Sequence, residues 1–134
     1  MTTEPTPTLA DLVRGYCEQY RNPQLPPFVV HDAHTMTSWY RTPESSKPGC
    51  YVFYSEGGEI LYVGKASLRS YVGARLAFHD RQKPRALWRE RATAVQFVSV
   101  TEAFEAPSLE EFLIERLRPA GNVRGGKLVA DPAN

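Results

Sequence analysis

The sequence predicts an α+β fold in which a small, three-stranded, mainly antiparallel sheet is flanked by helices. Between residues 48 and 66, two runs rich in β-branched and aromatic residues are separated by a short segment with two glycines, which is typical of a β-hairpin. Residues 94–100 alternate in polarity as a third strand does. Apolar residues recur at helical spacing before, between and after these segments, so helices should cover the sheet.

The composition is that of one globular domain. The chain has 134 residues, of which 42% are hydrophobic and 23% are charged, which is sufficient for a single core. No apolar run approaches the roughly 18 residues of a membrane span, and the first residues lack a signal-peptide pattern. We therefore expect a cytoplasmic protein without a membrane partner. Cys17 and Cys50 are too few for a disulfide framework and are expected to be small buried hydrophobes.

Residues 1–47 are interpreted as an N-terminal extension. Residues 8–21 repeat apolar positions at spacings of three and four, which predicts a helix that Thr8 can cap. The proline-containing stretch from residue 24 to 47 has no sustained period and is expected to be a loop. His31 and His34 lie in this stretch without a third ligand nearby, so we assign them surface or packing roles.

Strand alternation predicts which side chains of the hairpin share a face. In the first strand, Tyr51 and Phe53 point away from Cys50 and Val52. In the second strand, one face carries Ile60, Tyr62 and Gly64, and the other carries Leu61, Val63 and Lys65. Tyr51 and Tyr62 are therefore expected side by side on one face of the sheet.

Two helices are predicted to flank the third strand. Residues 68–81 place Arg75 and His79 on one side of a helix, one turn apart, and Trp88 anchors a short helix over residues 85–92. The last helix begins near Leu109 and ends at Pro119, with Ser108 and Glu111 as a capping box. Its Glu110 lies at the margin of the apolar stripe, where a partly buried carboxylate can hold a cation. A late strand is expected over residues 127–130.

The order of these motifs resembles the GIY-YIG nuclease family. Its two name-giving tripeptides correspond to Gly49-Cys50-Tyr51 and Tyr62-Val63-Gly64, and the continuation Lys65-Ala66 looks most like the nuclease module of the UvrC repair proteins. The third signature of the family is matched at every spacing by Leu109-Glu110, Leu113-Ile114, Pro119 and Asn122. The resemblance divides the chain into the extension, 1–47, and a GIY-YIG-like nuclease domain, 48–134.

The resemblance also implies the catalytic arginine. Arg75 and His79 match the family's arginine and the histidine or tyrosine four residues later. Arg75 lies three residues farther from the second motif than is usual, which indicates an insertion around residues 67–70 or one further near-turn of helix. Arg69 is the alternative, although it lacks both the usual spacing and the partner four residues on.

The function that the resemblance implies is metal-dependent hydrolysis of phosphodiester bonds by an endonuclease. Glu110 is expected to bind one divalent cation, Mg²⁺ or Mn²⁺, while Arg75 and Lys65 contact the phosphate. Tyr51 is expected to be the base, ionised with the help of nearby cations, and Tyr62 an orienting donor, with the reverse assignment left open. His79 is a candidate to accept the tyrosine proton or to contact the phosphate.

Nucleic acid is the expected partner, with DNA preferred over RNA. The formal net charge is only +1, but the basic residues of the middle third can form a local patch. The expected nucleic-acid-binding residues are Lys65, Arg69, Arg75, Arg81, Lys83, Arg85 and Asn122. Because such modules usually draw target choice from an attached domain, a homodimer or a specificity-giving protein partner is expected. The alternative is a catalytically silent nucleic-acid-binding module of the same fold.

Overall fold

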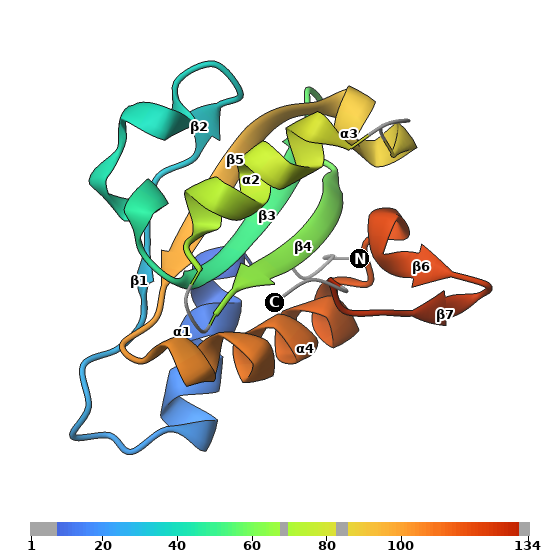
Figure 1. The fold of residues 1–134 in the computed structure, drawn as a ribbon. Coiled ribbons are helices and arrows are strands. Elements are labelled where there is room, and N and C mark those ends of the chain that lie inside the picture. The colour runs from blue at the N-terminus through green and yellow to red at the C-terminus, as the bar shows by residue number, and fades with distance from the viewer. Residues whose placement is uncertain (1–7, 68–69, 83–85, 132–134) are drawn as a thin grey trace, which may run out of the picture.

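In the computed structural model, which describes residues 8–67, 70–82 and 86–131, an antiparallel sheet lies between helices (Figure 1). Its central strand, β3 (Gly49–Ser55), pairs with β4 (Ile60–Ala66) on one side and with β5 (Ala92–Ser99) on the other. The predicted α+β class is confirmed, and the three predicted strands form the centre of the sheet. The extension adds two short strands, β1 (Val29–Val30) and β2 (His34–Thr35), which pair with β5.

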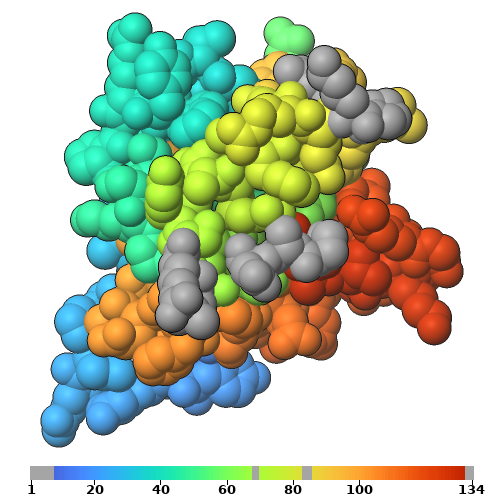
Figure 2. Space-filling model, in the orientation of Figure 1, coloured from blue at the N-terminus to red at the C-terminus, as the bar shows by residue number. Residues whose placement is uncertain are grey.

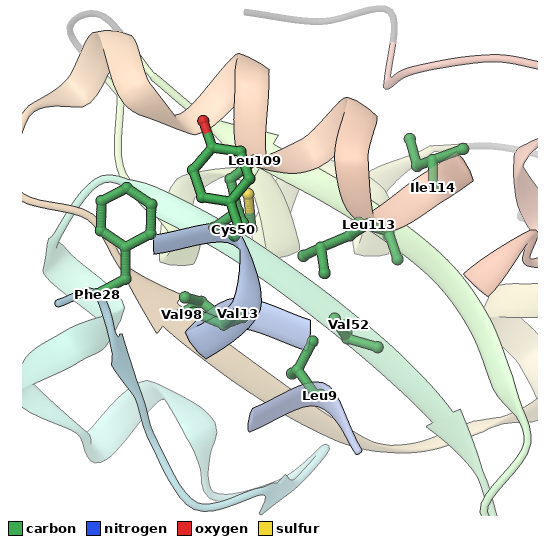
Figure 3. Packing of buried hydrophobic residues seen from close by; sticks show 11 residues of the cluster. Leu9, Val13, Phe28, Cys50, Val52, Val98, Leu109, Leu113 and Ile114 are labelled. Carbon is green, nitrogen blue, oxygen red and sulfur yellow. The ribbon is translucent and has the colours of Figure 1, made fainter. Parts of the chain in front are cut away.

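Two helices pack on one face of the sheet. α1 (Leu9–Tyr20) and α4 (Ala106–Leu117) direct their apolar side chains against strand residues that face the same way (Figure 3). Cys50 and Val52 of β3 and Val98 of β5 lie at the centre of this cluster and are completely buried. The apolar faces of both helices therefore form one hydrophobic cluster together with the sheet.

The opposite face carries α2 (Val72–Arg81) and α3 (Leu87–Arg91). Val72 and Leu76 of α2 pack on Tyr51, Phe53 and other residues of the sheet's second cluster. Figure 2 shows α2 lying across this face, with α4 below it and the last described strands beside α4. The predicted alternation of β3 and β5 is thus confirmed, because the two sides of each strand contribute to different clusters.

The extension is fastened to the rest of the fold by polar contacts as well as by strand pairing. Thr8 and Asp11 form a capping box at the start of α1, so the predicted Thr8 cap is confirmed. The hydroxyl groups of Tyr16 and Ser108 lie 2.6 Å apart, and Arg21 Nε donates to Glu105 Oε2 at 2.7 Å. These contacts join the end of α1 to the start of α4.

The hairpin contains one irregularity that the alternation did not predict. Tyr51 lies opposite Gly64 and Phe53 opposite Tyr62, but the register shifts at Tyr54, which pairs with Ile60. Ile60 consequently packs with the cluster on the α1 and α4 face, and its predicted place beside Tyr62 is wrong. A bulge inserts one residue and so exchanges the faces of the residues beyond it.

Two helix starts also differ from the predictions. The described part of α2 begins at Val72 rather than at residue 68, and Ser70 and Tyr71 lie before the helix, where Ser70 N donates to Ser67 O at 2.8 Å. Of the two interpretations of the three additional residues, this favours an insertion before the helix. α4 begins at Ala106, so the predicted capping box is wrong: Ser108 lies inside the helix, which Pro107 can start because its first turn needs no N–H donor.

The chain after α4 returns to the edge of the sheet. A one-turn 3₁₀ helix, Ala120–Asn122, leads into a small hairpin of β6 (Val123–Arg124) and β7 (Lys127–Leu128), which includes part of the predicted late strand. The following residues, 129–131, run back toward β4 and the site described below. In the described part of the chain, the helices lack the length and apolar character that crossing a bilayer requires.

Candidate active site

The candidate site lies beside β4, which is the last strand on its side of the described sheet. Tyr51 and Tyr62 come from the sheet face covered by α2, and α2 adds Arg75 and His79. From the other side, α4 brings Glu110 to within 3.5 Å of Lys65 on β4. The edge position allows side chains from both layers to meet.

Gly64 makes this meeting possible. A Cβ atom at residue 64 would lie 2.3 Å from both Cζ and Oη of Tyr51, far inside contact distance. The Tyr51 ring therefore extends over the backbone of β4 where a side chain is missing, and its hydroxyl reaches past the strand. The glycine of the first tripeptide is equally constrained, because a Cβ at Gly49 would lie 2.0 Å from Val98 O.

A buried hydrogen-bond network surrounds the hydroxyl of Tyr51. Tyr51 Oη lies 2.9 Å from His79 Nε2 and 2.5 Å from Asp131 Oδ2. Arg75 Nη2 donates to the other carboxylate oxygen, Asp131 Oδ1, at 2.8 Å. Asp131 is only 3% exposed, and no motif in the sequence predicted it in the site.

The same residue touches the second half of the site through its backbone. Asp131 N donates to Glu110 Oε2 at 3.2 Å, and Lys65 Nζ donates to Asp131 O at 3.2 Å. Burial raises the pKa of Glu110 to about 7, although the Lys65 ammonium opposes this shift. Asp131 therefore connects residues that the sequence placed in one site.

Within the described part of the chain, three buried polar atoms lack a hydrogen-bond partner, and all three belong to this site. They are Arg75 Nε, His79 Nδ1 and Glu110 Oε1. Buried polar groups in folded proteins almost always have partners. Their concentration here is what a site built to receive a polar ligand would show.

Both tyrosines of the site have a raised pKa. Burial raises the pKa of Tyr51 well above its ordinary value, and the neighbouring Asp131 carboxylate adds to the shift. The pKa of Tyr62 is likewise raised, mainly by burial. Without a bound metal ion, burial and the carboxylate outweigh Arg75 and disfavour the ionised form. The expectation that Arg75, Lys65 and a bound metal together favour ionisation stays a prediction.

Tyr62 is held by a stacked indole. The rings of Tyr62 and Trp88 are nearly parallel, with an interplanar angle of 2° and centroids 4.1 Å apart. Trp88 also packs at an angle against Phe53 and His79. The predicted anchor of α3 thus fixes the orientation of a tyrosine in the candidate site.

Asn122 lies inside the fold beside the site. Its side chain is completely buried, and its amide accepts from Val63 N at 2.9 Å and donates to Val63 O at 3.0 Å. The same amide donates to Val129 O at 3.1 Å, while Val129 N donates to Asn122 O at 2.7 Å. Asn122 covers the outer backbone groups of β4 and positions the segment that leads to Asp131.

The structure separates the predicted basic residues into several groups. Arg75 is buried in the site, Lys65 is largely buried beside it, and Arg81 is exposed at the end of α2. Arg69, Lys83 and Arg85 lie outside the described residues. His31 and His34 lie elsewhere: His34 Nε2 contacts Glu44 Oε1 at 2.8 Å and His31 Nε2 contacts Ser99 Oγ at 2.8 Å. Both therefore have the packing roles expected of them.

The sheet, its two tyrosines and the helices that bring arginine, histidine and glutamate to them define a GIY-YIG-type domain. A profile of the UvrC-like GIY-YIG domain matches residues 47–123. The chain belongs to this family, which confirms the resemblance.

Several relatives are UvrABC system protein C of bacteria. The protein of Thermus thermophilus is 42% identical over 82 residues, and that of Agrobacterium fabrum is 39% identical over 79 residues. These matches cover 60% and 58% of this chain but only 13% and 12% of the relatives. The chain thus spans a small part of the proteins it resembles.

Solved structures of the GIY-YIG N-terminal endonuclease domain of UvrC from Thermotoga maritima share the fold. The magnesium-bound form has a TM-score of 0.50 and 29% identity, covering 60% of this chain and 89% of that one. A point mutant bound to its catalytic divalent cation has a TM-score of 0.51 and 31% identity, covering 61% and 89%. The arrangement of helices on an antiparallel sheet is therefore that of this domain.

Proposed function

We propose that this protein is a divalent-cation-dependent endonuclease that hydrolyses phosphodiester bonds of DNA. The observation that supports this most directly is the convergence of Tyr51, Arg75, His79 and Glu110, which come from β3, α2 and α4, around one buried network. Membership of a family that includes an endonuclease domain bound to a divalent cation supports the same function.

Two cationic side chains are proposed to bind the scissile phosphate. Arg75 Nη2 binds a carboxylate oxygen in this structure, and its Nε has no partner among the described residues, so the guanidinium can offer both groups to an oxyanion. Lys65 lies 3.5 Å from Glu110 on the other side of the site. Together they would stabilise negative charge that develops on the phosphate oxygens.

Proton transfer is proposed to run from water through Tyr51 to His79. Because the pKa of Tyr51 is raised, the phenol keeps its proton at neutral pH and cannot act as a preformed base. Its hydroxyl lies 2.9 Å from His79 Nε2, so it can pass its proton to the imidazole while accepting one from the attacking water. Tyr62, held by Trp88, is assigned to orient the phosphate or the water. If Tyr62 instead accepted the proton of the water, proton transfer would not use the hydrogen bond between Tyr51 Oη and His79 Nε2.

The residues present fit a divalent cation held by a single protein carboxylate. Glu110 Oε1 is buried and makes no hydrogen bond to the described residues, apart from its ion pair with Lys65. Among these residues, no three histidine, cysteine or carboxylate side chains lie close enough together to hold a metal ion. Mg²⁺ commonly uses one or two carboxylates and keeps several waters. A bound Mg²⁺ or Mn²⁺ would neutralise charge on the phosphate and leaving group.

DNA is the proposed partner, and it would extend along the protein beyond the active site. Arg81 is exposed at the end of α2, where it can contact the DNA backbone beyond the scissile phosphate. We place the protein in the cytoplasm, acting on DNA rather than RNA. The nearby Arg89 and Arg91 are already paired with Asp80 and Glu59, so they offer less charge to DNA. A homodimer or a second protein is therefore proposed to supply the contacts that select the target.

The test is cleavage of labelled single-stranded, duplex and branched DNA with Mg²⁺ or Mn²⁺. Glu110→Gln keeps the shape of the side chain but removes its charge, and we expect at least about a 100-fold loss of cleavage. Glu111→Gln is the matched control, because Glu111 is the next residue of α4 and is exposed. It should cleave as the wild type does.

Full turnover by Glu110→Gln would remove Glu110 from the proposed site and place the metal elsewhere. DNA binding without cleavage by any variant, under all metal conditions, would instead favour the catalytically silent binding module. Equal cleavage in all preparations, including one without added metal, would indicate a contaminating nuclease.

A further inference from the structure

The most unexpected feature of the site is a carboxylate that the proposed reaction does not use. The side chain of Asp131 has no exposed surface, and it lies among Tyr51, Arg75 and His79. A buried carboxylate is costly unless charged or polar partners surround it. Here its partners are the groups proposed to bind a phosphate and to transfer a proton.

The contacts of Asp131 reproduce those expected of a substrate. Its Oδ1 accepts from Arg75 Nη2 at 2.8 Å, as a phosphate oxygen would, and its Oδ2 accepts from Tyr51 Oη at 2.5 Å, where the attacking water is proposed to bind. Its backbone oxygen accepts from Lys65 Nζ at 3.2 Å, and its backbone N–H donates to Glu110 Oε2 at 3.2 Å. One residue thus engages the phosphate-binding groups and the proposed metal ligand together.

The segment that carries Asp131 is attached in a way that allows it to leave. Val129 is fixed to Asn122 by hydrogen bonds at 2.7 and 3.1 Å. Ala130 is exposed, and Asp131 is held in the site by polar contacts that a phosphate and its counter-ions can replace. Rotation about Ala130 would withdraw the carboxylate without disturbing the clamp at Asn122.

We propose that Asp131 is an intramolecular substrate mimic, whose carboxylate occupies the phosphate site and keeps it closed until a nucleic-acid phosphate displaces it. This inference rests on the proposed function for the identity of the displacing ligand. A phosphate diester and the carboxylate cannot both bind Arg75, since both are anions that need the same donor. The apparent affinity for DNA is then lower than the intrinsic affinity by the fraction of molecules in the open state.

Hydrogen exchange resolved by residue tests the displacement directly. In the full chain with EDTA, the Asp131 amide should be protected, because it is buried and bonded to Glu110. A saturating short DNA duplex should remove this protection. The Val129 amide, bonded to Asn122 O, is the internal control and should remain protected. If bound DNA leaves the Asp131 amide protected, the substrate-mimic role is wrong.

Substitution of Asp131 provides the second test. Asp131→Asn removes the charge with little change of shape, and we expect its apparent Kd for the duplex in EDTA to fall about 10-fold. Inorganic phosphate should also bind more tightly to this variant. Asp32→Asn is the control, because it makes the same change of net charge at an exposed residue. Asp131→Ala should behave as Asp131→Asn does. This variant has no side-chain amide, so it shows whether the amide of Asp131→Asn itself affects binding.

The outcomes separate this inference from the proposed function. If wild type and Asp131→Asn cleave DNA equally and bind it equally, the substrate-mimic role of Asp131 is wrong and the proposed endonuclease activity still holds. Loss of cleavage in Asp131→Asn, with wild type active, would overturn it by making Asp131 a catalytic residue. If neither protein cleaves DNA, tighter phosphate binding by Asp131→Asn still supports the closed site, and unchanged phosphate binding overturns it.

Discussion

At the scale of single residues, the carboxyl group of Glu110 dominates the electrostatics of the site. It is 1% exposed, and burial raises its pKa from 4.5 to about 7. Between these two pH values and without a metal, Glu110 is therefore protonated in the folded protein and ionised in the unfolded chain. The free energy of unfolding should fall as pH rises from about 4.5 to about 7, by an amount on the order of 2 kcal/mol.

Urea unfolding at pH 5 and pH 8 in EDTA measures this effect. Glu110→Gln should lack this part of the fall, because an amide does not titrate, whereas Glu111→Gln should retain it. A fall of equal size in Glu110→Gln would show that another group titrates. The same proton competes with a cation for the carboxylate, so metal affinity should increase as pH rises through about 7.

At the scale of secondary-structure elements, the hairpin of β3 and β4 depends on Gly64. Its replacement by alanine would place Cβ 2.3 Å from the Tyr51 ring, and the ring would have to move away from His79. Gly64→Ala should reduce the free energy of unfolding by about 1–3 kcal/mol and cleavage by about 100-fold or more.

Gly15→Ala is the matched control for this prediction. Gly15 lies within α1, and a Cβ there would meet nothing within 4 Å. This variant should gain about 0.5–1 kcal/mol from its higher helix propensity and cleave normally. Chemical denaturation and the cleavage assay measure both variants. If Gly64→Ala retained wild-type stability and activity, Tyr51 would not need its observed position.

At the scale of the whole molecule, two arginines of the α1 region test how the extension is joined to the core. Arg21 binds Glu105 with side chains only 5% and 15% exposed, and its guanidinium lies over the Phe28 ring. Arg21→Ala would leave Glu105 partly buried without its cation, so the free energy of unfolding should fall by about 3 kcal/mol.

Arg14 offers the comparison, because its pair with Asp11 has side chains 64% and 47% exposed. Arg14→Ala should change the free energy of unfolding by less than about 0.5 kcal/mol, since solvent screens such a pair. Denaturant unfolding of both variants measures the difference. If Arg21→Ala changed the free energy of unfolding as little as Arg14→Ala does, the Arg21–Glu105 pair would contribute little to the stability of the fold.

Much of the fold could be predicted because its signals are local. Alternation identified β3 and β5, and the spacing of apolar residues identified α1 and α4. The predictions were wrong where a nearby feature altered the local pattern. The bulge near Leu61 changed the face of Ile60, and Pro107 moved the start of α4 so that Ser108 no longer capped it.

For the site, the sequence by itself determined which chemical groups are present and that the tripeptides, Arg75, His79 and Glu110 resemble one family's motif. Alternation within each strand also indicated that Tyr51 and Tyr62 can share a face, and the register of the hairpin places both in the same cluster. Only the tertiary structure decided that the pKa of both tyrosines is raised, because burial depends on every neighbour. Only the tertiary structure placed Asp131 among them, because contacts between residues 80 apart have no periodic signal in the chain.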